Sequence, residues 1–218
     1  MSERDGAGGR RYGGRTAEER RQARRDALLD AAYELFGTEG YRNVTIERVC
    51  SQARLTARNF YEEFGGREAL LLAIYDRTIG RSVEAVAAAL AKAGDGVRER
   101  AAAGLGAYAH TMLEDPRASR IVYVEIVGVS DAAERHRRSV HHAFADLVVG
   151  EAQGLLEAGA VTPRRSSRHA SLALVGGVNE LMIDWVQSDD PLPIDVLVEE
   201  LVDLFVAVGA GPPDRREI

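Results

Sequence analysis

Residues Thr45–Phe64 read TIERVCSQARLTARNFYEEF, and this stretch decides how the chain folds. Thr45 is a favourable N-cap for a first short helix, which is expected to end near Gln52. Thr56 is a second N-cap, and its helix is expected to continue to Phe64. Ala53-Arg54-Leu55 remains for the turn between the two helices. Two helices joined at a steep angle by so short a turn form a helix-turn-helix, whose second helix enters the major groove of DNA.

This stretch and its flanks resemble the DNA-binding domain of the TetR family of bacterial transcription regulators. The resemblance covers roughly residues 26–73, and beyond them it is only architectural. The matching residues are Phe36, Gly40-Tyr41, Thr45, Ala53-x-Leu55-Thr56, Phe60-Tyr61-x-x-Phe64 and Arg67-Glu68-x-Leu70. The family usually has glycine at the turn position that Arg54 holds here. A positive φ at Arg54 would cost about 1 kcal/mol relative to glycine.

Length and composition indicate a helical globular protein. The chain has 218 residues, of which 45% are hydrophobic and only 6% aromatic, and Ala, Val and Leu are plentiful. No apolar run reaches the roughly 20 residues that cross a bilayer, and the polar N-terminus lacks the apolar segment of a signal peptide. The lone cysteine, Cys50, excludes an internal disulfide. These features predict a cytoplasmic protein with no membrane partner.

Charge is distributed unevenly along the chain. The net charge is −6, yet residues 1–66 hold 12 Arg against 11 acidic residues, whereas residues 67–218 hold 16 basic and 23 acidic residues. A weakly basic head on an acidic body is compatible with a protein that binds DNA at one end. Lys occurs once, at Lys92, so arginine supplies nearly all of the phosphate-binding capacity.

The helical pattern predicts an all-α fold of about nine helices. Residues 1–15 are rich in Gly and Arg and are expected to form a disordered arm. Residues 16–66 are expected to form a three-helix DNA-binding domain that contains the helix-turn-helix. Residues 67–210 are expected to form a helical bundle for ligand binding and dimerisation.

The first helix begins with a capping box, Thr16-Ala-Glu-Glu19, and is expected to end at Phe36 before Gly37. Four basic residues crowd its first half. They are Arg20, Arg21, Arg24 and Arg25. Two interpretations remain open for them, namely a solvated face or contacts with DNA phosphates.

A long helix that begins at Arg67 is the expected mechanical link between the DNA-binding head and the body. Further along, Asp115-Pro116 marks a helix start, with Asp as the N-cap and Pro in the first helical position. The run Ile121–Val129 has the β-branched composition of a strand. We predict a helix there, because Asp-Pro and the flanking helices frame it.

Two helices near the C-terminus, Leu172–Val186 and Ile194–Val208, are apolar on nearly all sides. A helix with apolar faces on opposite sides has to bury both of them. One face is expected to meet the core of its own chain and the other a second copy. The resemblance implies the same, because TetR-like proteins dimerise through these two helices.

Exposed residues early in the second helix of the motif are expected to reach base edges. Arg58 suits the O6 and N7 acceptors of guanine, and Asn59 suits adenine. Thr56 and Ala57 precede them, and their methyl groups are placed to meet a thymine methyl group.

Other residues of the motif are expected to hold the DNA backbone. Tyr61 is placed to donate its hydroxyl to a phosphate, as the matching tyrosine of the family commonly does. Thr45 and Arg67 each lie near a helix N-terminus, where side chain and backbone N–H groups bind phosphates. Arg54 is either a phosphate contact or simply exposed.

The body is expected to enclose a pocket for an effector between its helices. The candidate lining residues are Tyr75, Tyr108, Met112, Tyr123, Glu125, Phe144, Asn179, Met182 and Trp185. Glu125 lies within an apolar run, so its carboxylate needs a partner, either an arginine or the ligand. The scarcity of charge among the candidates favours a small, largely apolar effector.

Enzyme and metal motifs are absent from the sequence, which contains no P-loop, no GxSxG and no HExxH. His136 and His141 are five residues apart, whereas two ligands on one helix face are three or four apart. We therefore expect neither a catalytic site, nor a metal, nor a cofactor.

Together these features predict a homodimeric transcription regulator that binds a pseudo-palindromic operator in double-stranded DNA and, as a repressor, is released by a ligand. Three alternatives remain open from the sequence alone. They are a TetR-like activator, a regulator without a small ligand, and an all-α enzyme or binding protein whose helical corner only resembles a DNA reader.

Overall fold

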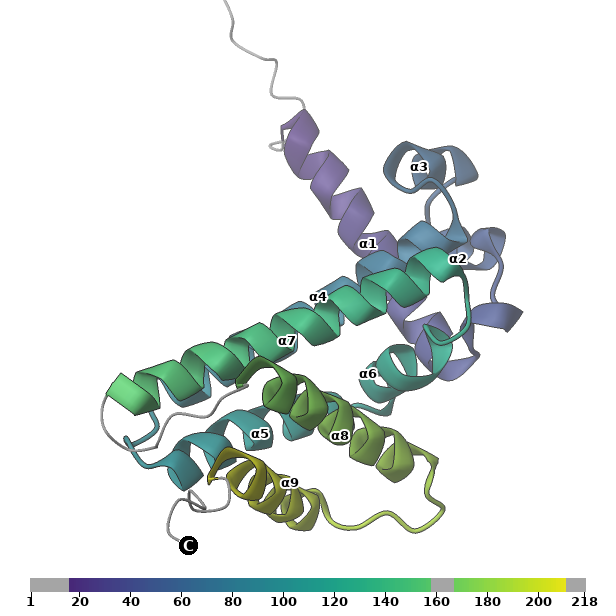
Figure 1. Cartoon of the computed structure of the whole chain (residues 1–218). Helices are drawn as coiled ribbons and strands as arrows, with labels where there is room; N and C mark the ends of the chain where they lie inside the picture. Colours follow the sequence, from purple (N-terminus) through teal and green to yellow (C-terminus); the bar gives the residue numbers. More distant parts are fainter. Residues whose placement is uncertain (1–15, 158–166, 211–218) are drawn as a thin grey trace, which may run out of the picture.

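A computed structural model describes residues 16–157 and 167–210, and the predicted N-terminal arm lies outside these residues. The described residues form nine α-helices, one 3₁₀-helix and one π-helix, without a β-strand (Figure 1). The α-helices are α1 Ala17–Thr38, α2 Ile46–Ala53, α3 Ala57–Glu63, α4 Arg67–Leu90, α5 Val97–Leu113, α6 Pro116–Arg120, α7 Asp131–Glu157, α8 Ser167–Gln187 and α9 Ile194–Ala210. The predicted all-α fold is confirmed.

Helix α1 begins with the predicted capping box. The Thr16 hydroxyl accepts the Glu19 N–H at 3.1 Å, and the Glu19 carboxylate accepts the Thr16 N–H at 2.6 Å. The expected end at Phe36 is wrong, because the helix continues through Gly37 to Thr38. A Cβ at Gly37 would overlap the side chain of Arg117, so this glycine lets α6 pack closely on α1.

The helix-turn-helix forms as its caps predict. The side chain of Thr45 caps α2 by accepting the Arg48 N–H at 3.2 Å, and that of Thr56 caps α3. Phe60 and Phe64 are 0% and 4% exposed, so the inner face of α3 belongs to the core of the head. The outer face of α3 is left free, as a DNA-reading helix requires.

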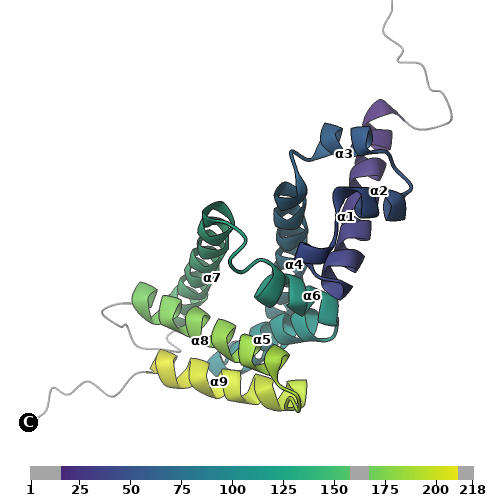
Figure 2. The ribbon, with the colours of Figure 1, turned by 90° about the vertical axis from the view of Figure 1, so that its right-hand side faces the viewer.

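In the body, α4 extends from the head and packs along α5, and α5 also packs on α9. Helices α7 and α8 pair with each other and form the other wall of the body, as seen when Figure 2 is compared with Figure 1. Helix α6 packs against α1, so the body touches the head through this short helix as well as through α4.

The segment Ile121–Val129 is only partly helical. Ile121–Glu125 forms a π-helix that continues α6, and the chain turns at Gly128, whose φ is +68°. The expected α-helix through Val129 is therefore wrong, although the first half of the run is helical. π-Helices are rare and often occur at functional sites.

Helices α8 and α9 each bury one stripe and leave further apolar groups at the surface. Leu174 and Met182 of α8 and Leu201 of α9 are 5% exposed or less, whereas Val196 of α9 is 40% exposed. Leu181 and other apolar residues between these stripes are half-buried. No described helix combines the length and the apolar character that a membrane span needs.

Candidate DNA-binding surface and effector cavity

The outer face of α3 presents the residues that the sequence predicts to contact DNA. Thr56, Ala57, Arg58 and Tyr61 are all exposed. The Arg58 side chain is 88% exposed, and within the described part of the chain it pairs only with Glu62 of the same helix, at 3.1 Å. Surface pairs of this kind contribute little to stability, so the Arg58 guanidinium is available to a base edge.

Asn59 has an intramolecular role that the sequence did not predict. Its side-chain oxygen accepts the Thr56 N–H at 3.2 Å and the Thr56 hydroxyl at 2.9 Å, which completes a capping box for α3. Bidentate recognition of adenine would use the same oxygen. The expected adenine contact therefore requires Asn59 to give up this cap.

Arg67 also has a role that differs from the expected one. Its guanidinium donates to the carbonyl of Val44 at 2.7 Å and lies over the ring of Tyr41, 4.4 Å from the centroid. This cation–π contact and hydrogen bond tie the start of α4 to the segment before α2. The side chain that was expected to bind phosphate is thus part of the packing of the head, whereas Thr45 is exposed beside the α2 N-terminus.

Arg54 occupies the left-handed conformation for which the resemblance implies glycine. Its φ and ψ are 56° and 40°, and among the described residues no other non-glycine residue has a positive φ. Its N–H bonds to carbonyls of the last turn of α2, while its side chain is exposed and forms no ion pair within the described residues. The position keeps a strained backbone and presents a free guanidinium beside the motif.

Replacing Arg54 by glycine is expected to raise the free energy of unfolding by about 0.5–1 kcal/mol, because glycine adopts positive φ without strain. Denaturant titration measures this change. The matched control is Arg42→Gly, at an exposed residue with negative φ, which is expected to lower the free energy of unfolding. A lower midpoint for the Arg54 variant would contradict this account of the turn.

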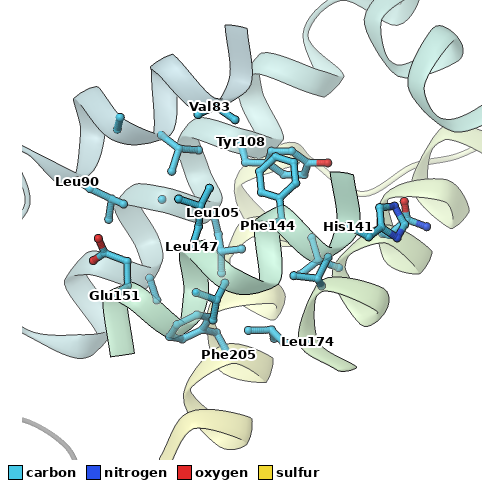
Figure 3. A pocket seen from close by; sticks show the side chains of 18 of the residues that line it. Val83, Leu90, Leu105, Tyr108, His141, Phe144, Leu147, Glu151, Leu174 and Phe205 are labelled. Carbon is cyan, nitrogen blue, oxygen red and sulfur yellow. The ribbon is translucent and has the colours of Figure 1, made fainter. Parts of the chain in front are cut away.

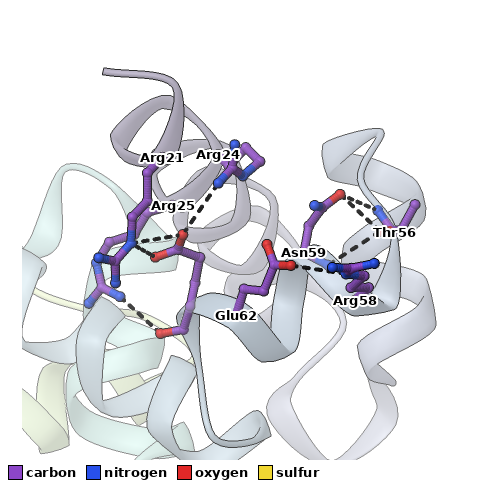
Figure 4. Close-up of polar contacts among 8 residues, drawn as sticks. Arg21, Arg24, Arg25, Thr56, Arg58, Asn59 and Glu62 are labelled. Atoms are coloured by element: carbon purple, nitrogen blue, oxygen red, sulfur yellow. Dashed lines mark hydrogen bonds and ion pairs between the residues drawn. The ribbon is translucent and has the colours of Figure 1, made fainter. Parts of the chain in front are cut away.

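The basic residues of α1 bind the end of α3, as Figure 4 shows. Arg21 contacts the carboxylate of Glu63 at 3.2 Å, and Arg24 approaches it at 3.9 Å. Arg25 donates to the Glu63 carbonyl at 3.3 Å and lies over the ring of Phe64. Three of the four arginines therefore anchor the recognition helix, which neither of the two open interpretations anticipated.

A cavity of about 470 Å³ lies in the body, between α4, α5, α7 and α8, and Phe205 of α9 also lines it (Figure 3). Most of its wall is aliphatic or aromatic. The apolar lining residues include Ile79, Val83, Val86, Leu90, Val97, Leu105, Val140, Leu147, Val148, Leu174, Val175 and Val178. Its volume lies in the range of about 300–1,000 Å³ that is typical of small-molecule sites.

Four of the predicted ligand residues line this cavity, namely Tyr75, Tyr108, Phe144 and Asn179. The sequence missed the aliphatic residues that make most of the wall, because nothing in a helical repeat of Val and Leu separates a cavity wall from a filled core. It also missed Arg100 and Glu151, which bring charge to the lining.

Five predicted ligand residues lie elsewhere. Met112 and Met182 are fully buried in the core, and Trp185 borders a separate hollow of about 380 Å³. Tyr123 lies behind the cavity wall, where its hydroxyl is 2.8 Å from that of Tyr108. Glu125 binds Arg120 at 2.8 Å, so an arginine, one of the two predicted partners, accounts for its carboxylate.

Glu125 lies where the body meets the head. Its carboxylate accepts the N–H of Tyr41 at 2.7 Å, and Arg120 donates to the carbonyl of Thr38 at 2.8 Å. Tyr123, on the same π-helix, meets Tyr108 of the cavity wall. A continuous set of contacts therefore joins the cavity, through the π-helix, to the segment that precedes the helix-turn-helix.

Polar groups gather at two places along the cavity. Glu151 and His141 lie at opposite ends of it in Figure 3. Burial and the nearby charge of Arg137 lower the pKa of His141, which therefore stays neutral at neutral pH, and Asn179 hydrogen bonds to it. Burial likewise raises the pKa of the Tyr108 hydroxyl. One end thus offers neutral hydrogen-bonding groups and the other a charged pair.

Residues 28–74 match the sequence model of a protein family that is described as bacterial regulatory proteins, tetR family. The match covers the second half of α1, all of α2 and α3, and the start of α4. The head of this chain is a DNA-binding domain of the TetR family. The chain is a DNA-binding transcription regulator, and the exposed outer face of α3 fits that function.

Other known proteins are similar to this chain over both its head and its body. The transcriptional activator FasR of Mycolicibacterium smegmatis is 26% identical over 204 residues, which cover 90% of this chain and 86% of FasR. FadR of Bacillus subtilis, solved with stearoyl-CoA, superposes with a TM-score of 0.75 at 16% identity, covering 84% of this chain and 98% of FadR. AibR, solved with isovaleryl coenzyme A and operator DNA, gives a TM-score of 0.61 at 17% identity, covering 83% of this chain and 97% of AibR.

Cys50 lies within the core of this TetR-family head and is 4% exposed. Burial raises the pKa of its thiol, which disfavours the reactive thiolate. Across residues 16–157 and 167–210, no cluster of three or more His, Cys, Asp or Glu side chains is placed to hold a metal ion.

Proposed function

We propose that the protein is a homodimeric repressor that a fatty acyl ligand, in the form of a coenzyme A thioester, releases from its operator. The observation that carries the proposal is the cavity of about 470 Å³, whose wall is mostly aliphatic and aromatic. An apolar chain placed there would remain out of water, and burial of each methylene group stabilises the complex by about 0.8 kcal/mol.

The relatives support an acyl thioester as the ligand. FadR of Bacillus subtilis was solved with stearoyl-CoA and AibR with isovaleryl coenzyme A. These ligands combine an apolar acyl chain with a large polar head, and the cavity combines a long apolar wall with polar groups at its ends. We therefore propose an acyl-CoA as the largely apolar effector that the sequence predicts.

Ligand binding would reach the head through the π-helix. An acyl chain in the cavity contacts Tyr108, which bonds to Tyr123, while Glu125 on the same π-helix holds the Tyr41 N–H. A ligand shifts the DNA-binding equilibrium only if it favours one arrangement of these contacts over the other. The arrangement with ligand is proposed to space the two heads incorrectly for the operator.

Dimerisation through α8 and α9 is part of the proposal. The buried stripes of both helices face the core of their own chain, and half-buried Leu181 and Ile183 together with exposed Val196 remain for a partner. Two heads related by a two-fold axis would meet half-sites about one helical turn of DNA apart or slightly more.

An activator is the second candidate, because FasR, which is 26% identical, carries that description. An activator would use the same head, cavity and dimer, but the ligand would favour the DNA-bound arrangement. The two candidates differ in the sign of the ligand effect on DNA affinity.

Selection of DNA fragments from a random pool by the purified protein tests whether the outer face of α3 contacts the bases. We expect the wild-type protein to select a pseudo-palindrome, and Arg58→Ala to lose about 1–3 kcal/mol of operator binding together with its preference at one base pair in each half-site. Arg135→Ala, an exposed arginine of α7, is the control and should select the wild-type sequence. Selection of the same sequence at the same affinity by the Arg58 variant would place the reading surface elsewhere.

A further inference from the structure

Charged side chains are scarce along the wall of the cavity, which makes those present informative. Among its lining residues the arginines and acids number one each, Arg100 of α5 and Glu151 of α7. They pair across the cavity, from Nη2 of Arg100 to a Glu151 carboxylate oxygen at 2.6 Å and from Nε at 3.1 Å. Two helices from opposite walls are therefore bridged at the end where Glu151 lies in Figure 3.

The two members of this pair differ in how firmly they are held. The Arg100 side chain is 23% exposed, and its Nη1 also donates to the carbonyl of Leu90 at the end of α4, at 3.4 Å. The Glu151 side chain is 38% exposed, and no hydrogen bond other than those from Arg100 is found for it among the described residues. The Glu151 carboxylate can therefore move into solvent more easily than the Arg100 guanidinium can.

We propose that Arg100 recognises an anionic head group on the acyl ligand, with a ligand oxygen replacing Glu151 on the guanidinium. This assignment rests on the proposed function and adds to it the residue that selects the head group. A half-buried guanidinium needs an anionic partner, and the exchange preserves that pairing. The planar guanidinium of Arg100 can donate two parallel hydrogen bonds, a geometry that suits both carboxylate and phosphate oxygens.

The opposite end of the cavity suits a neutral group instead. His141, neutral at neutral pH, and Asn179 offer hydrogen bonds without a permanent charge, and Arg137, whose guanidinium lies 3.3 Å from the His141 ring, does not itself line the cavity. An anion placed there would lose solvation without contacting a cation of the cavity wall. The charged end is therefore the end where an anionic head is recognised.

Three probes with the same chain separate the head groups: palmitoyl-CoA, palmitate and neutral methyl palmitate. We expect Arg100→Gln to weaken binding of at least one of the two anionic probes about tenfold or more and to leave methyl palmitate within about threefold of wild type. Loss for palmitate identifies a carboxylate as the group that Arg100 binds, and loss for palmitoyl-CoA alone identifies a phosphate. Titration calorimetry provides the dissociation constants.

Arg98→Gln is the matched control, because Arg98 lies two residues away, pairs with Asp203 at 2.7 Å and does not line the cavity. It removes the same charge and should leave all three dissociation constants unchanged. Glu151→Gln removes the competing carboxylate and should tighten binding of the anionic probe at least about threefold. This variant decides the question if Arg100→Gln does not fold.

Unchanged binding of both anionic probes by Arg100→Gln, or by Glu151→Gln, would overturn the role of Arg100 while leaving the acyl-binding function intact. Failure of the wild-type protein to bind any of the three probes would overturn the proposed function, and the assignment of Arg100 with it.

Discussion

Replacing Glu63 by glutamine is expected to detach the recognition helix from α1 and to abolish specific DNA binding. The Glu63 side chain is 1% exposed, and its carboxylate is the shared partner of Arg21 and Arg24. Removing the buried carboxylate leaves both guanidiniums without their anionic partner, and breaking a fully buried pair typically costs several kcal/mol. Because both arginines are partly exposed, we expect a loss of about 2–3 kcal/mol in the free energy of unfolding.

Denaturant unfolding and a DNA-binding titration measure the two effects of the Glu63 substitution. Glu62→Gln is the matched control, because Glu62 is the preceding residue and is 44% exposed, and its one ion pair among residues 16–157 and 167–210 is with the exposed Arg58. This control should change the free energy of unfolding by about 0.5 kcal/mol or less. Equal stability of the two variants would contradict the anchoring role of the α1 arginines.

Replacing Gly104 by leucine is expected to close the cavity and to make DNA binding insensitive to ligand. Gly104 lines the cavity, and a Cβ added there would lie 3.6 Å from the Leu90 side chain and 3.9 Å from that of Val86, which are ordinary contact distances. The added side chain therefore fits the backbone and occupies space that an acyl chain would need. We expect affinity for palmitoyl-CoA to fall about tenfold or more, because an obstructed cavity accepts extra volume only with strain.

Stability separates a filled cavity from a damaged fold. Leucine is a better helix former than glycine by about 0.8 kcal/mol, so Gly104→Leu should unfold at a higher temperature than wild type. Gly80→Leu is the control, because no described atom outside the local backbone of α4 lies within 4 Å of a Cβ at Gly80, and Gly80 is not among the cavity-lining residues. It should gain stability and keep its ligand affinity. Wild-type affinity in the Gly104 variant would exclude this cavity as the acyl site.

Local signals in the sequence were sufficient to predict the helix-turn-helix of the head. Thr45 and Thr56 cap their helices as their residue types predict, and the turn between them needs one left-handed residue, which is Arg54. Such features depend on a few neighbouring residues, so their spacing alone predicts them. The beginning of α4 at Arg67 was predicted in the same way.

Side-chain partners in the head could not be predicted, because they come from distant parts of the chain. Arg21 meets Glu63, 42 residues later, and the Arg67 guanidinium reaches the Val44 carbonyl. A basic stripe has the same pattern in the sequence whether it faces solvent, DNA or a buried carboxylate. Asn59 is a local exception, because a capping box needs only Thr56 three residues earlier.

The cavity was predictable in kind but not in detail. Of the residues that the sequence predicts to contact a ligand, Tyr75 and Tyr108 line the cavity, whereas Met182 is buried in the core. Whether an apolar residue lines the cavity or packs tightly depends on the distances between α4, α5, α7 and α8. The apolar pattern of a single helix does not contain this information. The pairing of Arg100 with Glu151, 51 residues apart, likewise depends on the packing of α5 and α7.

The most direct test of the account is fluorescence anisotropy of the selected operator, titrated with protein in the absence and presence of palmitoyl-CoA, with free coenzyme A as the control. If an acyl ligand in the cavity releases the heads, palmitoyl-CoA should raise the dissociation constant for the operator at least about tenfold, which corresponds to about 1.4 kcal/mol of coupling, and coenzyme A should leave it unchanged. An operator affinity that palmitoyl-CoA does not weaken at any concentration would contradict ligand release.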